Sequence, residues 1–375
     1  MTSSVLGTPL VDWVAAAQIA ARVAPPGPTA SRDELAALVA GLREAASAAV
    51  PHVLRVTRMS PPDLTPPPGA GEGTLELSQV YVVDRSRWAL ANTEVMASLT
   101  DGVAESFTAA GDKPVSPATA LVGAAQVGAV LAALSSRVLG QFDPYSVLDP
   151  DAGAAPGRLL LVAPNLLQLE RDLDLVPADF RLWVCLHEQT HALQFTAAPW
   201  LAEHLRAAAR DLLVGLSESS RQLAEARLRD KLTTAGRVVL RAVRGQDGSV
   251  AHGLLTPDQQ RALEEVSAVM ALLEGHADVM MDAVGRATVP TVRRIRAQFE
   301  ARRDGQGAGT LDTVLRRFLG MDAKLAQYRD GAAFVRAVER DVGRDGLNAV
   351  WSGPEHLPSA QEIADPRAWV RRVHG

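Results

Sequence analysis

Apolar residues recur every three to four positions over most of the chain, which is the spacing of a helix with one buried face. Amphipathic helices are predicted at residues 11–23 and 33–49, and almost everything after Pro199 has the same helical pattern. Short apolar runs at residues 80–83 (VYVV) and 158–165 (RLLLVAPN) are bounded by turn residues and predict strands. The pattern therefore predicts an α+β fold that is mainly α, with a small sheet.

Proline and glycine break this pattern at residues 60–74 (SPPDLTPPPGAGEGT), which predicts a loop there. No internal repeat occurs at a fixed period. We therefore expect a single domain over residues 1–375. Within it we expect two lobes: residues 75–198, which hold the predicted strands, and residues 199–375, which are almost wholly helical.

Residues 118–134 (ATALVGAAQVGAVLAAL) are apolar enough to raise the question of a membrane span. The stretch is at the short limit for crossing a hydrocarbon layer of about 30 Å. It is also rich in Ala and Gly, where a lone span usually carries Leu, Ile and Phe. We therefore expect a helix that is closely packed on all sides in a protein core, and no membrane partner.

Composition narrows the class of protein further. A chain that is 47% hydrophobic and 22% charged can bury a large core, and its 4% of aromatic residues favours helix packing over an all-β fold. A formal net charge of -5 provides no positive field for nucleic acid, so we expect no nucleic-acid partner. The single cysteine cannot form an internal disulfide and the N-terminus lacks a secretory pattern, so we expect a cytoplasmic protein.

The segment Leu182–Phe195 (LWVCLHEQTHALQF) contains the pattern H-E-x-x-H within a helix predicted over residues 180–197. His187 and His191 are four residues apart, so both imidazoles lie on one helical face and can bind one metal ion. Glu188 projects to the side of that ion. Zinc lowers the pKa of a coordinated water, and an adjacent carboxylate can accept its proton. This spacing predicts zinc bound by His187 and His191, with Glu188 as general base.

Catalytic zinc sites have three protein ligands, and the third must lie further along this chain. Metzincins place a glycine and a third histidine at fixed positions after the motif, where this chain has glutamine and alanine. The best candidate is Glu274 in residues 271–282 (ALLEGHADVMMD), within the second lobe. Asp278, one turn later, would accept the free ring N–H of a ligand histidine. Two alternatives stay open: His276 as the third ligand, or a solvated polar face that supplies no ligand.

Four segments stand out for a joint resemblance: FRLWVCLHEQTHALQFTAAPWLAEHL, LLEGHADVMMDAVG, LGMDAKLAQYRDG and LPSAQEIADPRAWVRRV. Together they resemble a family of uncharacterised zincin-like hydrolases of actinobacteria, some of them associated with the biosynthesis of a deazaflavin coenzyme. The resemblance covers most of the chain and implies a zincin-like, metalloprotease-type fold with metal-dependent hydrolase activity. Glu274 and Asp278 also resemble the second motif of gluzincin peptidases, although their distance from His191 along the chain is long for a simple gluzincin.

A hydrolase also needs a donor that stabilises the negative oxygen of the transition state. Tyr328 is our candidate, because Lys324 lies one turn before it and the two form a donor pair on one helical face. Tyr145 and His252 are weaker alternatives. The pattern favours a structural role over this one, with Tyr328 partly buried and packed beside the aliphatic part of the lysine side chain.

The sequence thus predicts a zinc-dependent hydrolase, a metallopeptidase or another amidohydrolase, whose partner is a peptide or a small amide substrate. If residues 158–165 form the edge of the sheet above the metal, an extended peptide could pair with that strand. The alternative is a catalytically silent zincin-like scaffold or binding protein associated with coenzyme biosynthesis. The presence of Glu188 argues against it, because a purely structural metal site has no use for a base beside its ligands.

Overall fold

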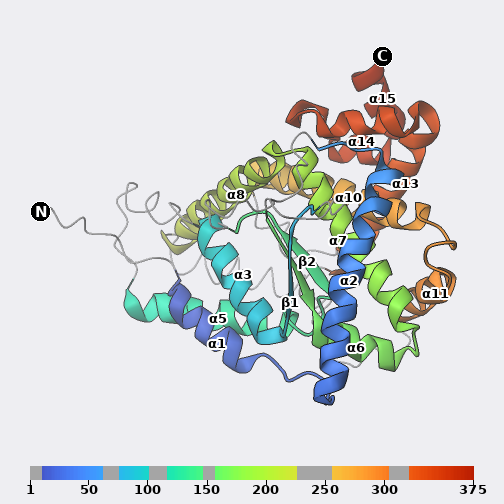
Figure 1. Ribbon diagram of the computed structural model, residues 1–375. Helices are drawn as coiled ribbons and strands as arrows, with labels where there is room; N and C mark the ends of the chain where they lie inside the picture. The colour runs from blue at the N-terminus through green and yellow to red at the C-terminus, as the bar shows by residue number, and fades with distance from the viewer. Residues whose placement is uncertain (1–10, 62–75, 101–115, 147–156, 226–255, 304–320) are drawn as a thin grey trace, which may run out of the picture.

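The structure, a computed structural model, describes residues 11–61, 76–100, 116–146, 157–225, 256–303 and 321–375 (Figure 1). Its strands are β1 (Gln79–Val83), β2 (Gly140–Asp143) and β3 (Arg158–Val162). Its α-helices are α1 (Trp13–Val23), α2 (Arg32–Thr57), α3 (Arg85–Thr100), α5 (Pro117–Leu134), α6 (Ala163–Asp172), α7 (Pro177–Ala197), α8 (Trp200–Glu225), α10 (Pro257–Ala283), α11 (Val292–Arg303), α13 (Met321–Leu347), α14 (Ala360–Ala364) and α15 (Pro366–His374). The predicted α+β, mainly α class is confirmed.

The described strands form one sheet in the order β1-β3-β2. β1 runs parallel to β3, and β2 runs antiparallel to it, with Gly140 opposite Leu161. The predicted strand at residues 158–165 is therefore the central strand, and its last three residues begin α6 instead. The condition for peptide pairing on this strand, an edge position, is not met, because β3 lies between β1 and β2, and the hydrophobic pattern did not predict β2.

Helices pack on both faces of the sheet (Figure 1). Leu159 and Leu161 of β3 belong to the main apolar core, which α2, α7, α10 and α13 share. Leu160 and Val162 face a smaller cluster with α1, α3 and α5. Burial on both faces explains why β3 is a continuous apolar run without alternation. The main core contains residues of both predicted lobes, and it is the scaffold on which α7 is fixed.

Helix α7 carries the H-E-x-x-H pattern and begins at Pro177, three residues earlier than predicted. Its N-terminal part is tied to the start of α11, because both the backbone N–H and the hydroxyl of Thr291 donate to the Asp179 carboxylate. Its apolar back contacts α2, and it also contacts α10 and β2. The helix ends at Ala197, before Pro199, as the sequence pattern predicts.

The apolar helix α5 differs from its prediction. It packs on α1 and α3 along one face, where Gly128 lets α1 approach so closely that a Cβ there would lie 2.9 Å from the Ala16 carbonyl. Leu121, Val122 and Val130 on its other side are exposed. Among the described residues α5 is the one helix long and apolar enough to span a membrane. A helix packed on all sides was expected, and the structure instead shows a surface helix with one buried face (Figure 1).

Candidate metal centre

Helices α7 and α10 bring together the three residues predicted as metal ligands. The Nε2 atoms of His187 and His191 lie 3.1 Å apart. Glu274 Oε2 lies 3.4 Å from the first of these nitrogens and 3.7 Å from the second. The four-residue spacing on α7 puts the two rings on one face, and the packing of α10 on α7 delivers the carboxylate.

The spacing of these atoms fits a small tetrahedral metal ion. Zinc–nitrogen bonds of about 2.0–2.1 Å at tetrahedral angles place neighbouring ligand atoms about 3.3 Å apart. The three separations, 3.1, 3.4 and 3.7 Å, cluster around that value. Two imidazole nitrogens and one carboxylate oxygen are also a common ligand set of catalytic zinc, which keeps a fourth position open.

The charges around the three groups favour a cation between them. Burial opposes ionisation of Glu274, but the charge of His191 and hydrogen bonds from both histidines hold the pKa of this carboxyl well below its usual range. Burial also works against protonation of His191, yet the Glu274 and Glu188 carboxylates raise its pKa to about 9. A proton and a metal ion therefore compete for the same position.

Glu188 lies beside the three ligand groups and is nearly buried, with 6% of its surface exposed. Within the described part of the chain no hydrogen-bond donor contacts its carboxylate, and burial raises its pKa although the two neighbouring histidines lower it. The carboxylate lies against Gly140, the first residue of β2, where an added Cβ would be 2.6 Å from Glu188 Cγ and Cδ. A side chain at position 140 and the carboxylate cannot both occupy this space.

Gly140→Ala is therefore expected to displace Glu188 and to lower kcat/KM by up to about 100-fold, the loss that a 1 Å misplacement of a reacting group can cause. Bound zinc should stay at the wild-type level, because position 140 is crowded by Glu188 and not by a ligand atom. Steady-state kinetics and metal analysis of the same preparation measure both quantities. Unchanged turnover would show that Glu188 has room to move without consequence.

A cavity with a volume of about 210 Å³ opens beside His187 and Glu188. Its other walls are mostly apolar, and the lining residues are Leu139, Trp183, Val184, Asp278, Met281, Arg296 and Phe299. Arg296 lies over the Trp183 ring, with its guanidinium carbon 5.5 Å from the ring centre. The centre is thus connected to a space that can hold a large apolar group.

The hydrogen-bond partner of a ligand histidine is not the predicted one. Asp278 lines the cavity, but its carboxylate pairs with Arg296 at 2.7 Å, and no described hydrogen bond joins it to either histidine. Gln194 takes the predicted role for His191, whose Nδ1 lies 2.9 Å from Gln194 Oε1. Arg296 comes from α11, the next described helix, so spacing within α10 does not reveal the pair.

His276, the alternative third ligand, does not join the group. Its side chain is fully buried, its Nδ1 contacts Gln194, and its ring packs against Trp351. Burial lowers its pKa to about 3, so this histidine is neutral. The structure therefore brings Glu274, and not His276, to His187 and His191.

Of the three predicted transition-state donors, only Tyr145 has a side chain among the described residues. Tyr328 lies within α13, but its side chain and that of Lys324 lie outside the described residues, as does His252. Tyr145 follows β2 and lies under Arg206, whose guanidinium carbon is 5.2 Å from the ring centre. Burial raises the pKa of Tyr145 to about 12, and the residue is not among those that line the cavity.

The small sheet, the H-E-x-x-H helix and the clustered ligand groups are the features of a zincin-like metalloprotein. The sequence profile of the zincin-like metallopeptidase family matches residues 11–370, and the chain belongs to this family. A family of this kind implies a bound metal ion.

A solved structure from Chloroflexus aurantiacus, described as a "putative hydrolase with a novel fold", is similar to this chain. The two sequences are 29% identical, the match covers 96% of this chain and 98% of the other, and the TM-score is 0.62. A search of the curated proteins found no match. The relationship thus supports a hydrolase but assigns no specific activity.

Proposed function

We propose that the protein is a zinc-dependent hydrolase of peptide or other amide bonds, with zinc held by His187, His191 and Glu274. The observation that carries this proposal is the combination at one place: three ligand atoms at tetrahedral spacing, and a buried carboxylate beside them that accepts no hydrogen bond from the described residues. A purely structural zinc site usually has four protein ligands and needs no adjacent base.

Zinc, when bound, supplies a Lewis acid that polarises the substrate carbonyl and acidifies water. Glu188 accepts the proton of the attacking water at its carboxylate and passes it to the leaving nitrogen, for which its raised pKa is suited. Because Gly140 has no side chain, there is room beside it for this carboxylate. Tyr328 remains our candidate for the donor to the negative oxygen of the transition state.

The surroundings of the centre support a peptide substrate with a large apolar side chain. β2 is an edge strand of the described sheet, which is the position at which an extended chain would add a further strand. Because Gly140 of this strand touches Glu188, a peptide on this edge would pass close to the base. The cavity next to Glu188, whose wall carries large apolar side chains as well as the Asp278–Arg296 ion pair, would receive a side chain adjacent to the cleaved bond.

Metal analysis and a peptide library test this proposal together. The purified protein is expected to contain about one equivalent of zinc, and His187→Ala should lose it because two remaining ligands are too few for a catalytic site. His204→Ala on α8, outside the ligand group, is the matched control and should keep the metal. The library, read by mass spectrometry, should show chelator-sensitive cleavage next to large apolar residues.

Two results would contradict the proposal. A wild-type protein that holds no metal after gentle purification would remove the zinc site altogether. A protein that binds zinc but cleaves neither peptides nor other amides would favour the alternative of a catalytically silent zincin-like scaffold, for instance one associated with coenzyme biosynthesis.

A further inference from the structure

Gln194 is a fully buried side chain on α7 that connects both ligand-bearing helices. Its Oε1 lies 2.9 Å from His191 Nδ1. Its Nε2 donates to the Leu273 carbonyl on α10 at 2.9 Å and lies 3.0 Å from His276 Nδ1. Leu273 is the residue directly before Glu274, so this one side chain touches a ligand histidine and the backbone beside the third ligand.

The Leu273 carbonyl fixes the direction of every hydrogen bond in this group. A carbonyl oxygen can only accept, so the Gln194 atom that faces it must be the amide nitrogen. The amide oxygen therefore faces His191, and since this oxygen also only accepts, His191 Nδ1 must carry a hydrogen. The other ring nitrogen, Nε2, is then the one that can offer a lone pair to a metal.

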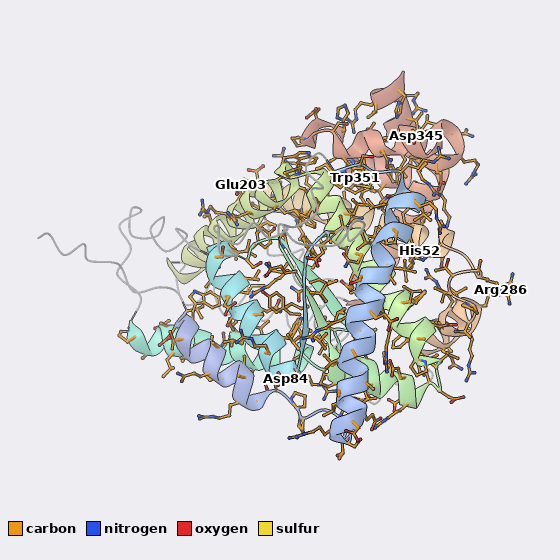
Figure 2. The ribbon with its side chains drawn as sticks, viewed as in Figure 1. His52, Asp84, Glu203, Arg286, Asp345 and Trp351 are labelled. Carbon is orange, nitrogen blue, oxygen red and sulfur yellow. The ribbon has the colours of Figure 1, made fainter. Side chains whose placement is uncertain are left out.

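The second hydrogen of the amide determines the state of His276 in the same way. It is donated to His276 Nδ1, which must therefore be unprotonated, and the ring hydrogen lies on Nε2. This Nε2 has no hydrogen-bond partner in the described structure, and the ring meets that of Trp351 edge-on, with ring centres 5.1 Å apart. Trp351 itself is labelled in Figure 2. The Gln194 amide nitrogen thus donates to two residues of α10, Leu273 and His276.

We infer that Gln194 is a positioning residue that sets His191 in its metal-binding tautomer and fixes the His191 ring relative to Glu274. The inference rests on the proposed metal centre and adds to it a device that joins α7 to α10. A carboxylate, the frequent partner of ligand histidines, could accept from His191 but could not donate to the Leu273 carbonyl. The amide does both, and adds no third negative charge beside Glu188 and Glu274.

Gln194→Met tests this inference through zinc affinity, measured by competition with a chromophoric chelator. The variant keeps the approximate length of the side chain and removes all three hydrogen bonds. Its Kd for zinc is expected to rise about 10–100-fold, as for loss of other partners of ligand histidines. The matched control is Gln189→Met on the same helix, 1% exposed, whose Nε2 donates to the Ala46 carbonyl at 3.1 Å. Its zinc Kd should stay within about 2-fold of the wild type.

Gln194→Glu separates the effect on the metal from the effect on folding. The carboxylate still accepts from His191 Nδ1 but loses the tie to α10, so the Kd of this variant for zinc should lie between those of the wild type and Gln194→Met. The carboxylate places an oxygen against the Leu273 carbonyl, so the melting temperature should fall. Wild-type zinc affinity in Gln194→Met, or equal weakening in Gln194→Glu and Gln194→Met, would overturn the inference.

Nitrogen-15 NMR of the metal-free protein with labelled histidines gives a readout that needs no zinc. His276 is expected to have hydrogen on Nε2 and a bare Nδ1 in the wild type, and to lose this preference in Gln194→Met. Hydrogen on His276 Nδ1 in the wild type would contradict the described contacts and with them the inference. A wild type that binds no zinc but shows the expected His276 tautomer would instead count against the proposed function and against the metal-binding part of this inference.

Discussion

Glu188→Gln is expected to bind zinc like the wild type and to lose about 10²–10⁴-fold in kcat/KM, the usual contribution of a general base. The amide has the same shape as the carboxylate but cannot accept the proton of water. Folding stability should change little, because no described hydrogen bond to the Glu188 carboxylate is lost. Kinetics on a peptide found by library screening, metal analysis and thermal unfolding measure the three quantities.

Glu170→Gln is the matched control for this substitution. Glu170 is exposed to the same extent as Glu188, 6%, but it lies on α6 and binds Arg181 through both oxygens at 2.7 and 2.9 Å. The control should lose about 1–3 kcal/mol of unfolding free energy, because a charged hydrogen-bond partner is weakened, and should keep its turnover per folded molecule. Glu188→Gln is therefore expected to lower catalysis but not stability, and Glu170→Gln to lower stability but not catalysis. Unchanged turnover in Glu188→Gln would exclude Glu188 as the base.

The parts of the centre that local spacing determines could be predicted from the sequence. His187 and His191 share a helical face because they are four residues apart, and the helix itself follows from its apolar periodicity. Glu274 is a later carboxylate that can complete a zinc site, and the packing of α10 on α7 brings it to the two histidines. These predictions needed only the period of a helix and the ligand preferences of zinc.

The parts that depend on contacts between distant segments could not be predicted. β2 is a four-residue strand with Gly140, a glutamine and an aspartate, so it lacks the apolar run that marks a strand, and its role at Glu188 went unnoticed. Asp278 was given to a histidine because Arg296, which pairs with it, belongs to another helix. Gln194 lies one turn after His191, so a search of that turn for acceptors would have found it.

Helix α5 shows the limit of reading burial from composition. Its Ala- and Gly-rich sequence allows close packing, and the structure uses this property only on the side that faces α1 and α3. The apolar side chains on the opposite side are exposed although nothing in their type distinguishes them from those that are buried. Composition predicted a well-packed helix, but the number of its packed faces depends on the neighbouring elements.

Glu274→Gln is expected to weaken zinc binding by more than the ~10–100-fold caused by loss of a hydrogen-bond partner of a ligand. The substitution keeps the shape of the side chain but removes the negative charge of the ligand. Asp278→Asn, one turn later on the same helix, is the matched control. Asp278 pairs with Arg296, which also contacts Asp282, so the loss of its charge should leave the zinc Kd nearly unchanged. Equal weakening in both variants would mean that Asp278 supports a ligand histidine after all, and full zinc affinity in Glu274→Gln would remove Glu274 as the third ligand. Since His276 is held by Gln194 and packed against Trp351, it has no path to replace Glu274 without breaking both contacts.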